Sequence, residues 1–511
     1  MHRFVRRIAL PACLALLAAG CAGVPFDYPT TESSYIADTA STTLGREVAE
    51  WSADHPGASG FYSLEDARSA LAARIYLIDA AESSLDLQYF ILKGDATGQL
   101  VAAKLLAAAD RGVRVRFLID DAMTSGLDDG LIALNSHPSI EVRIFNPLTR
   151  QSFKAWSWVA DFKRANRRMH NKSLTADSQL TIVGGRNLAD EYFNLRDDSL
   201  FFDMDLIAAG PVALEVSEVF DMFWNSDKAV PVEAFDKGKN KFNLEQFREF
   251  LDASADAQAA YEAALKSQLV LDLLDDRVEF VVAPYQVLTD RPDKIDNPIA
   301  EEYQIVVNEL SRAADIATSE MIIVSPYFIP REAGMNMLRD LVARGVRVII
   351  VTNSLSANNH VPVHSAYSKY RKPLLAAGVE IYEFRVDAAA NETDIAEAGG
   401  EQPPATLHAK VLVVDQKWLF VGSLNLDPRS IDINTEMGLV LESPVLATEL
   451  RDYVMEDLPV YAYRLRLNDK GDLEWIGFGP DGEEVFSKEP NTSFGRRFGA
   501  GFYKIVPEGQ L

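Results

Sequence analysis

Two short segments of the chain carry the same reactive side chains in the same order. Residues 169–187 (MHNKSLTADSQLTIVGGRN) place a histidine, a lysine and an aspartate in the pattern HxKxxxxD, and a glycine and an asparagine follow an apolar run. Residues 407–425 (LHAKVLVVDQKWLFVGSLN) repeat this arrangement with identical spacing. The residues are His170, Lys172, Asp177, Gly184 and Asn187 in the first copy and His408, Lys410, Asp415, Gly422 and Asn425 in the second. One such match is weak evidence, but two copies with equal spacing predict a functional site.

These residue types suit chemistry on a phosphodiester. In a strand, side chains two positions apart point to the same face, so each histidine is expected beside its lysine. Ammonium and amide groups can hold the non-bridging oxygens and stabilise negative charge in the transition state. One neutral imidazole can attack phosphorus, and the other, when protonated, can donate to the departing oxygen. The two copies therefore predict one site with two histidines, and the spacing alone does not choose the nucleophile.

Histidines in such roles need acidic residues that orient them. Glu436, which follows Asn425 by 11 residues, is the candidate in the second half, and Asp203 is its counterpart in the first. The motif aspartates, Asp177 and Asp415, come at strand ends, where setting a turn is the more natural role. The chemistry requires no metal and no cofactor. The acids within residues 117–121 and 126–129 lack histidine partners, and a turn is favoured there over a cation site.

The duplication extends to the elements that must position the motifs. Apolar patterns predict strands at 84–92, 113–121 and 140–147, and again at 321–330, 344–354 and 379–384. A helix is expected at 98–112, and a capping box at Ser63 and Asp66 predicts another through about Ala81. Tyr89 and Tyr327 precede their respective histidines by the same 81 residues. We therefore expect an α/β fold of two similar lobes, each a mixed sheet flanked by helices, with the active site at the lobe interface.

The chain divides into six predicted segments. These are a leader (1–20), a polar tether (21–60), a first lobe (61–230), a helical connection (231–300), a second lobe (301–455) and a C-terminal hairpin with an amphipathic tail (456–511). In the tail, Phe494, Phe498 and Phe502 recur at helical spacing with arginines among them. These rings could rest on an anionic membrane surface. Closure of the core is the interpretation that we favour.

The N-terminus has the features of an export signal. Arg3, Arg6 and Arg7 precede an apolar run at residues 8–19 that is too short to span a bilayer. The segment ends in LAAGC, which resembles a bacterial lipoprotein cleavage box with Cys21 as the lipidated residue. We therefore expect an exported lipoprotein that is anchored to a membrane through Cys21 and faces the periplasm, with the choice between inner and outer membrane left open. The alternative is an ordinary signal peptide with a chance cysteine.

Composition narrows the range of partners. Apolar residues make up 48% of the chain, as in folded globular proteins. The formal net charge of −25 argues against broad binding of nucleic acids, because an acidic surface repels a phosphate backbone. The only cysteines are Cys13 and Cys21, so removal of the leader would leave no pair for a disulfide within one chain. No obligate protein partner is indicated.

The paired motifs, with GGRN (184–187) and GSLNLDPRS (422–430) behind them, resemble the phospholipase D superfamily. The likeness runs from about residue 60 to the C-terminus. Over this range the chain resembles in particular the bacterial cardiolipin synthases of the C type. The segments that carry it include RGVRVRFLIDD, NRRMHNKS, VTNSLSANN, HSAYSKYRK, NTEMG and EPNTSF. The resemblance implies that the six motif residues form the active site, that His170 is the nucleophile, and that Asn187, Ser423 and Asn425 line the phosphate site. Gly185 stands where the second half has Ser423, so only one half offers a hydroxyl.

The activity that this resemblance implies is phosphatidyl transfer through a phosphohistidine. Phosphatidylglycerol and a second phospholipid, which is phosphatidylethanolamine in the C type, would give cardiolipin. A hydrolytic phospholipase D that releases phosphatidic acid would use the same residues. A metal-independent nuclease fits poorly with an acidic, tethered chain, and a non-catalytic lipid-binding lipoprotein fits poorly with intact motifs. Arg164, Arg167 and Arg168 could meet anionic headgroups or form a solvated basic face.

Overall fold

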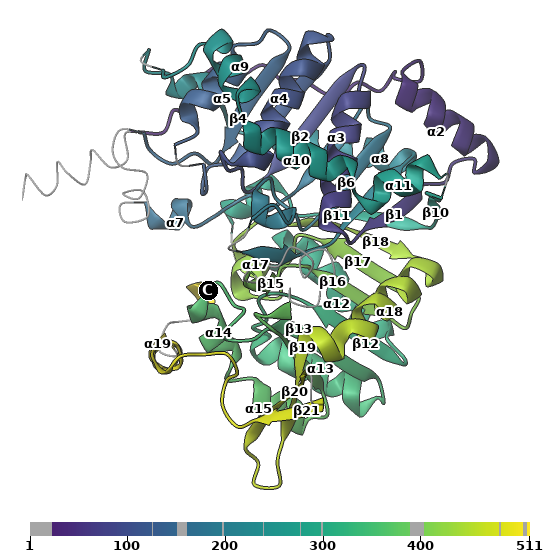
Figure 1. The fold of residues 1–511 in the computed structure, drawn as a ribbon, viewed down its shortest axis with the longest axis vertical. Coiled ribbons are helices and arrows are strands. Elements are labelled where there is room, and N and C mark those ends of the chain that lie inside the picture. Colours follow the sequence, from purple (N-terminus) through teal and green to yellow (C-terminus); the bar gives the residue numbers. More distant parts are fainter. Residues whose placement is uncertain are drawn as a thin grey trace, which may run out of the picture.

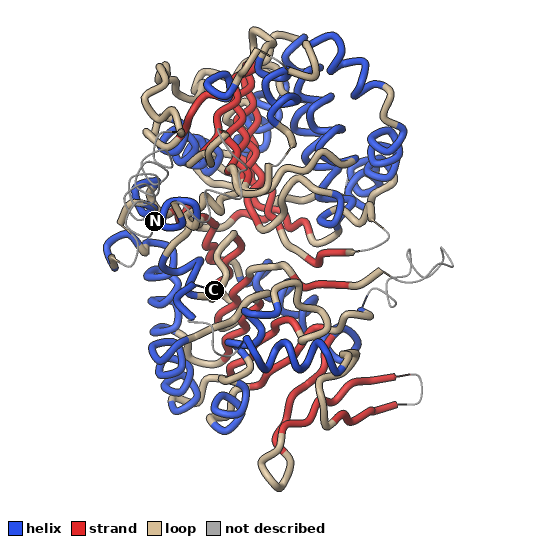
Figure 2. Tube along the Cα trace, turned by 90° about the vertical axis from the view of Figure 1, so that its left-hand side faces the viewer, coloured by secondary structure: helices blue, strands red, loops and turns tan. Residues whose placement is uncertain are grey.

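Apolar runs along the chain form the strands of two large sheets, one in each lobe (Figure 1). The computed structural model describes residues 23–124, 126–150, 161–196, 199–238, 240–275, 277–297, 300–388, 403–479, 482–503 and 508–510. The predicted leader and Cys21 lie outside the described residues. Helices lie beside the strands of each lobe (Figure 2). The α/β fold of two similar lobes that the sequence predicts is confirmed.

The sheet of the first lobe has the strand order β10-β1-β8-β6-β5-β2-β3-β4-β9. Its strands are β1 (Gly60–Leu64), β2 (Ser84–Tyr89), β3 (Arg114–Asp120), β4 (Ile140–Phe145), β5 (Ser173–Ala176), β6 (Leu180–Gly184), β8 (Asp205–Ala209), β9 (Ala229–Pro231) and β10 (Val281–Val282). Its helices are α2 (Thr43–Asp54), α3 (Ala67–Ala80), α4 (Ala96–Asp110), α5 (Asp128–Asn135), α7 (Phe162–Ala165) and α8 (Pro211–Trp224), joined by α9 (Leu244–Asp252), α10 (Ala255–Leu265) and α11 (Gln268–Leu274).

The sheet of the second lobe has the order β11-β18-β17-β16-β12-β13-β14-β19-β20-β21. Its strands are β11 (Tyr285–Thr289), β12 (Glu320–Val324), β13 (Arg347–Asn353), β14 (Glu380–Phe384), β16 (Val411–Val414), β17 (Trp418–Gly422), β18 (Met437–Glu442), β19 (Ala462–Leu467), β20 (Leu473–Gly479) and β21 (Gly482–Phe486). Its helices are α12 (Ile305–Ile316), α13 (Arg331–Ala343), α14 (Val361–Tyr367), α15 (Arg371–Ala376), α17 (Pro428–Asp432), α18 (Pro444–Tyr461) and α19 (Phe494–Tyr503).

The two sheets share one pattern at their centres. In the first lobe, β2, β3 and β4 are parallel, and β5 and β6 run antiparallel on the other side of β2. In the second lobe, β12, β13 and β14 are parallel, and β16 and β17 take the places of β5 and β6. The parallel strands are buried on both faces, which suits the apolar run of β12, whereas the buried Arg116 of β3 and Asp86 of β2 form an ion pair. Each HxKxxxxD motif therefore enters its sheet at the same position, beside the first parallel strand.

The segment predicted as a polar tether packs against the first lobe from about residue 33 onward. The main-chain N–H of Tyr35 donates to Asp221 at 2.8 Å, and the Thr39 hydroxyl donates to the carbonyl of Asp177. Leu44 and Val48 of α2 are buried. The tether prediction is wrong for this stretch, because its few apolar residues fall on one face of a helix and are enough to dock it.

Three further features differ from the sequence prediction. Asp66 caps α3 by accepting from the main-chain N–H of Ser69 at 2.6 Å, but Ser63 pairs with Leu206 in the β1–β8 ladder and takes no part in capping. The predicted connection 231–300 holds three helices, and it also supplies β10 to the first sheet and β11 to the second. The C-terminal hairpin, β19 and β20, extends the second sheet next to β14, so it belongs to that lobe.

The lobes are joined by a small parallel ladder and a shared apolar core. β7 (Leu200–Phe202) of the first lobe pairs with β15 (Ala405–Leu407) of the second. One cluster of buried residues combines Val183 and Leu206 with Ile322, Val421 and Leu439. Because main-chain hydrogen bonds cross the interface, the two motifs are held in a fixed relation to each other.

The motif aspartates fasten equivalent turns in the two lobes. Asp177, in a left-handed conformation (φ 50°), accepts from the main-chain N–H groups of residues 82–84 at 2.8–3.0 Å. Asp415 (φ 53°) accepts from those of residues 318–320 at 2.7–2.9 Å and also from the hydroxyls of Thr318 and Ser319. Each carboxylate thus ties the turn after its motif to the start of the first parallel strand. Among the described residues, these contacts all lie at the turn and neither carboxylate bonds to a histidine.

We predict that Asp415→Asn lowers the free energy of unfolding by about 1–2 kcal/mol at pH 7, because an amide replaces a charged acceptor of several hydrogen bonds. Although burial opposes it, these hydrogen bonds hold the pKa of Asp415 well below its usual range. The carboxylate therefore stabilises the fold above its unfolded pKa of about 4, and this contribution is lost as pH falls towards the folded pKa. Urea denaturation should show the difference at pH 7 and a smaller one below about pH 4. The exposed Asp469→Asn is the control, and equal stability of Asp415→Asn and wild type at pH 7 would contradict the assignment.

Candidate active site at the lobe interface

His170 is positioned by the second lobe as well as by its own. Its main-chain N–H donates to the carbonyl of Thr435 at 2.9 Å, and the N–H of Thr435 donates to the carbonyl of Arg168 at 3.0 Å. This short bridge places Glu436 beside the imidazole, with its Oε2 2.8 Å from Nδ1 of His170. His170 is 6% exposed and Glu436 is fully buried.

His408 is positioned in the same way by the first lobe. It follows β15, and its main-chain N–H donates to the carbonyl of Phe202, at the end of β7, at 2.7 Å. Asp203 comes next in the chain, and its Oδ2 lies 2.5 Å from Nδ1 of His408. The two acids that the sequence identified are therefore brought to the histidines, and each serves the histidine of the opposite lobe. With both Nδ1 atoms engaged, Nε2 of each ring is the nitrogen left for substrate.

The two motif lysines complete a four-membered cluster. The ammonium groups of Lys172 and Lys410 donate to the carbonyls of His170 and His408, respectively. Nζ of Lys410 also lies 2.9 Å from Nδ1 and 3.3 Å from Nε2 of His408. Burial lowers the pKa of His170, and so do the charges of both lysines. Because the charge of a lysine from each lobe lowers the pKa of the same imidazole, the two motifs form one site.

Burial sets the resting charges of this cluster. It lowers the pKa of Lys172 to about 7 and that of Lys410 to about 8, and it lowers the pKa of His408 to about 3. Burial also raises the pKa of Glu436 to about 7. Both imidazoles are therefore neutral at pH 7, and an anion between them would favour the protonated forms of lysine and histidine.

The pKa of Asp203 shifts in the opposite direction from that of Glu436. Burial alone would raise the pKa of Asp203, but Lys410 and His408 hold it well below its usual range. Asp203 therefore stays ionised, and the site is electrostatically asymmetric.

The residues expected to line the phosphate site differ in their contacts. Ser423 donates to Oε2 of Glu436 at 2.5 Å and accepts from the N–H of Met437 at 3.0 Å, so it holds the carboxylate. The amide of Asn187 donates to the Tyr192 hydroxyl at 2.8 Å and accepts from the N–H of Ile91 at 3.0 Å. The buried Oδ1 of Asn425 has no hydrogen-bond partner among the described residues. Asn425 is thus the one of the three whose side-chain oxygen lacks a partner in the described part of the chain, and its NH2 group would be the donor to a phosphate oxygen.

The glycine in place of a serine has a steric reason. A Cβ atom added at Gly185 would lie 2.0 Å from Oδ1 of Asp203 and 2.7 Å from its Cγ. In the first lobe the carboxylate of Asp203 thus occupies the space that the Ser423 side chain fills in the second. The sequence showed this asymmetry but not its cause.

Aromatic rings that the sequence interpretation missed enclose both imidazoles. Phe201 stacks on His408 with centroids 5.2 Å apart at 10°, and Tyr192 meets the same ring edge-on at 5.1 Å. Phe90 meets His170 edge-on at 5.0 Å. The signal was present in the sequence, because Phe90 follows the strand-end Tyr89 and Phe201 lies two residues before Asp203. These rings exclude water from the histidines.

Hydrogen bonds of Asp120, Arg167 and Arg168 fix the main chain just before His170. Asp120 accepts from the N–H of Met169 at 2.9 Å and pairs with Arg168 at 3.3 Å, and both side chains are fully buried. Arg167 donates to the carbonyl of Ile295 at 2.6 Å. Arg168 therefore faces neither headgroups nor solvent.

Among the described residues no group of three or more His, Cys, Asp or Glu side chains is placed to hold a metal ion.

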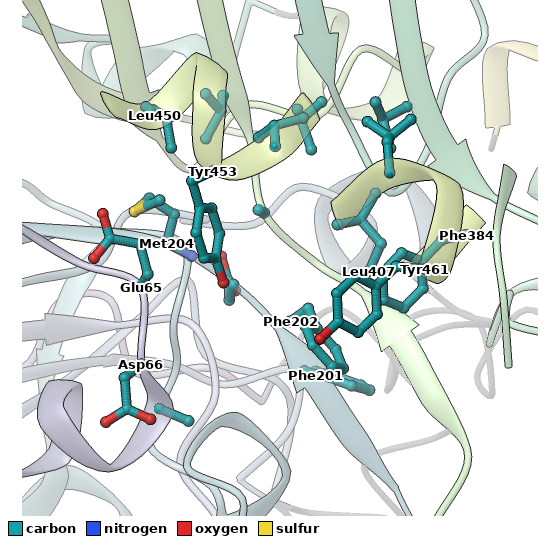
Figure 3. A pocket seen from close by; sticks show the side chains of 18 of the residues that line it. Glu65, Asp66, Phe201, Phe202, Met204, Phe384, Leu407, Leu450, Tyr453 and Tyr461 are labelled. Atoms are coloured by element: carbon teal, nitrogen blue, oxygen red, sulfur yellow. The ribbon is translucent and has the colours of Figure 1, made fainter. Parts of the chain in front are cut away.

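A cavity of about 300 Å³ lies between the lobes, and Figure 3 shows Phe202, Leu407 and Tyr461 on its wall. Its walls are mainly apolar and aromatic side chains from β7, β15 and α18, including Phe202, Leu407 and Tyr461. Asp203 and Phe201 form part of the wall, so the cavity adjoins the site.

Comparison with known proteins finds the same duplication. A family model described as "Cardiolipin synthase, PLD-like domain" matches residues 75–224 and 310–458. Cardiolipin synthase C of Escherichia coli (strain K12) is 38% identical over 471 residues, which cover 91% of this chain and 98% of that protein. An uncharacterized protein of Helicobacter pylori (strain ATCC 700392 / 26695) is 32% identical, with coverage of 96% and 97%.

A solved structure shares the two-lobed fold. The phosphatidylserine synthase of Haemophilus influenzae Rd KW20 superposes with a TM-score of 0.54 at 12% identity, covering 90% of this chain and 100% of that one. At this identity the likeness bears on the fold alone.

We predict that Gly185→Ala reduces turnover by about a hundredfold, because the new methyl group displaces Asp203 and with it the His408 ring. Gly509→Ala, where the added atom meets nothing within 4 Å, is the matched control. Thermal unfolding would show whether Gly185→Ala still folds, and Asp203→Asn should reproduce the loss without added bulk. Normal turnover in both Gly185→Ala and Asp203→Asn would contradict the assignment.

Proposed function

The chain belongs to the cardiolipin synthase family of the phospholipase D superfamily and is a phosphatidyltransferase, and on this premise we propose that it makes cardiolipin through a phosphohistidine. The acceptor is phosphatidylglycerol, and the phosphatidyl donor is phosphatidylethanolamine. The observation that carries the proposal is the pair of imidazole–carboxylate contacts that cross the lobe interface, each beside a buried motif lysine.

In the first step the phosphodiester of the donor lies between the two imidazoles. Lys172, Lys410 and Asn425 hold its non-bridging oxygens, and the negative charge keeps both ammonium groups protonated. Nε2 of His170 attacks phosphorus as the bond to the ethanolamine oxygen breaks, and His408 donates a proton to that oxygen. The products are free ethanolamine and a phosphatidyl group on His170.

In the second step the free glycerol hydroxyl of phosphatidylglycerol takes the place of the departed headgroup. Its proton passes to Nε2 of His408, which is now neutral, while its oxygen attacks phosphorus. The bond between phosphorus and His170 breaks, and cardiolipin leaves. His408 is then protonated again, as it was when the donor phosphodiester lay in the site, and it returns this proton to solvent when cardiolipin leaves and the neutral resting state is restored.

Several features support transfer between lipids over the alternatives. His170 and His408 are 6% and 7% exposed and lie under aromatic rings, which disfavours water as the acceptor and hence simple hydrolysis. The apolar cavity beside Asp203 suits an acyl chain better than a nucleotide. The net charge of −25 also argues against a nuclease.

Anchoring through a lipid on Cys21, facing the periplasm, is part of the proposal. None of the helices that the structure describes is long and apolar enough to cross a membrane. A lipid at Cys21 would bring the site to the bilayer from which both substrates come.

Purified protein mixed with vesicles of phosphatidylethanolamine and phosphatidylglycerol should form cardiolipin and ethanolamine, identified by mass spectrometry. His170→Ala and His408→Ala should each lower the rate by about a thousandfold or more. Wild type that is denatured rapidly during turnover at neutral or mildly alkaline pH should carry a phosphatidyl adduct on His170, because acid would hydrolyse the bond between phosphorus and the imidazole nitrogen. Phosphatidic acid as the main product would favour the hydrolytic alternative, and full activity in both histidine variants would refute the mechanism.

Cells grown with radioactive palmitate should incorporate label into the protein, and Cys21→Ser should abolish the incorporation. His170→Ala is the control, because it removes activity without altering the leader. Label that persists in Cys21→Ser would show that Cys21 is not the anchor.

A further inference from the structure

The C-terminal helix α19 turns an aromatic face away from the protein. Phe494, Phe498 and Phe502 are 77%, 69% and 64% exposed and lie four residues apart, on one side of the helix. Ala500 is the buried residue of α19. The expectation that these phenylalanines close the core is therefore wrong. The helix meets the second lobe through the buried Ala500 and the side chain of Arg496. Among the described residues, its rings stack only on one another and on Tyr503.

The helix is fixed to a loop that reaches the active site. Nε of Arg496 donates to the carbonyl of Leu355 at 2.8 Å, and its Nη2 donates to that of Asn358 at 2.6 Å. In the same loop, Asn359 accepts from the hydroxyl of Tyr327 at 2.6 Å. The carbonyl of Ala357, in the same loop, accepts from the hydroxyl of Thr406 at 2.8 Å, and Thr406 precedes His408 by two residues. Figure 1 shows α19 at the edge of the second lobe beside α14, on the side where α17 and α7 also lie.

The composition of α19 matches a bilayer surface. Its ten residues, FGRRFGAGFY, contain two arginines and no acid, in a chain whose net charge is −25. Aromatic rings favour the boundary between headgroups and acyl chains. The two guanidinium groups donate to protein carbonyls, Arg496 to those of Leu355 and Asn358 and Arg497 to that of Thr492, and they keep the positive charge that attracts anionic headgroups. Ten helical residues span about 15 Å, so the helix can lie in this boundary but cannot cross the bilayer.

We propose that α19 is a membrane-surface helix that inserts Phe494, Phe498 and Phe502 into the boundary region of an anionic bilayer. In this position it holds the loop 355–359 and the adjoining active site against the lipid surface. The inference deepens the proposed function, on which it rests for the need to reach lipid substrates. It adds a second contact with the membrane, independent of Cys21.

The test uses the full chain with Cys13 and Cys21 replaced by serine and a single new cysteine that carries an environment-sensitive fluorophore. The probe is placed by Phe498→Cys in one protein and by Leu274→Cys in the control, where Leu274 is a 78% exposed helical residue of the first lobe. Adding vesicles of phosphatidylethanolamine and phosphatidylglycerol should shift the emission of the Phe498→Cys probe to the blue and leave the Leu274→Cys probe unchanged. The proposal would be overturned by no shift at position 498 or by equal shifts at both positions. It would also be overturned by a shift that appears without vesicles when the protein is concentrated, because that would indicate self-association.

A second measurement compares activity on vesicles with activity on short-chain phospholipids dispersed as monomers. Replacing Phe494, Phe498 and Phe502 by serine should lower the ratio of the rate on vesicles to the rate on monomers by about tenfold or more, because less protein resides at the vesicle surface. An unchanged ratio would count against the proposal. The probe experiment needs no turnover, so a probe that enters the bilayer in a protein that makes no cardiolipin would refute the proposed function and leave the role of α19 standing.

Discussion

The imidazoles of His170 and His408 are each held by a carboxylate from the opposite lobe, and the rest of the site depends on this exchange. The same crossings carry main-chain hydrogen bonds, from His170 to Thr435 and from His408 to Phe202. A lobe on its own would present a histidine with an unfixed tautomer and a carboxylate without its partner. The shared apolar core between the sheets therefore has a chemical consequence, because any relative shift of the lobes would disturb both histidines together.

Burial determines the charge of the four basic side chains at the lobe interface. Two lysines and two histidines are enclosed where the charged forms are disfavoured, and their pKa values fall. Such a cluster lacks an anion, and a phosphodiester supplies one. The site is thus complementary to a charge that arrives with the substrate, and its aromatic cover limits competition by water.

The duplicated lobes have diverged where two identical halves would not fit. The second lobe has a longer acid, Glu436, held by Ser423, whereas the first has Asp203 and the space that Gly185 leaves for it. The pKa of Glu436 is raised and that of Asp203 is lowered, so the histidines face different carboxyl groups. This difference offers a physical basis for a division of labour between nucleophile and proton donor.

By itself, the sequence determined the residue types of the site, the duplication, and hence a two-lobed α/β fold with one shared centre. These features follow from periodicity and spacing, which are local properties of a chain. The sequence also singled out Glu436 and Asp203, but it could not say which histidine each serves, because both acids have equivalent places in their own lobes. Tertiary structure decided that pairing and turned Ser423 and Asn187 inward onto protein partners. It likewise left the rings of α19 outside the core and docked the segment after residue 33 onto the first lobe. All of these outcomes depend on contacts between residues far apart in the chain, where packing and burial select among partners that local pattern cannot distinguish.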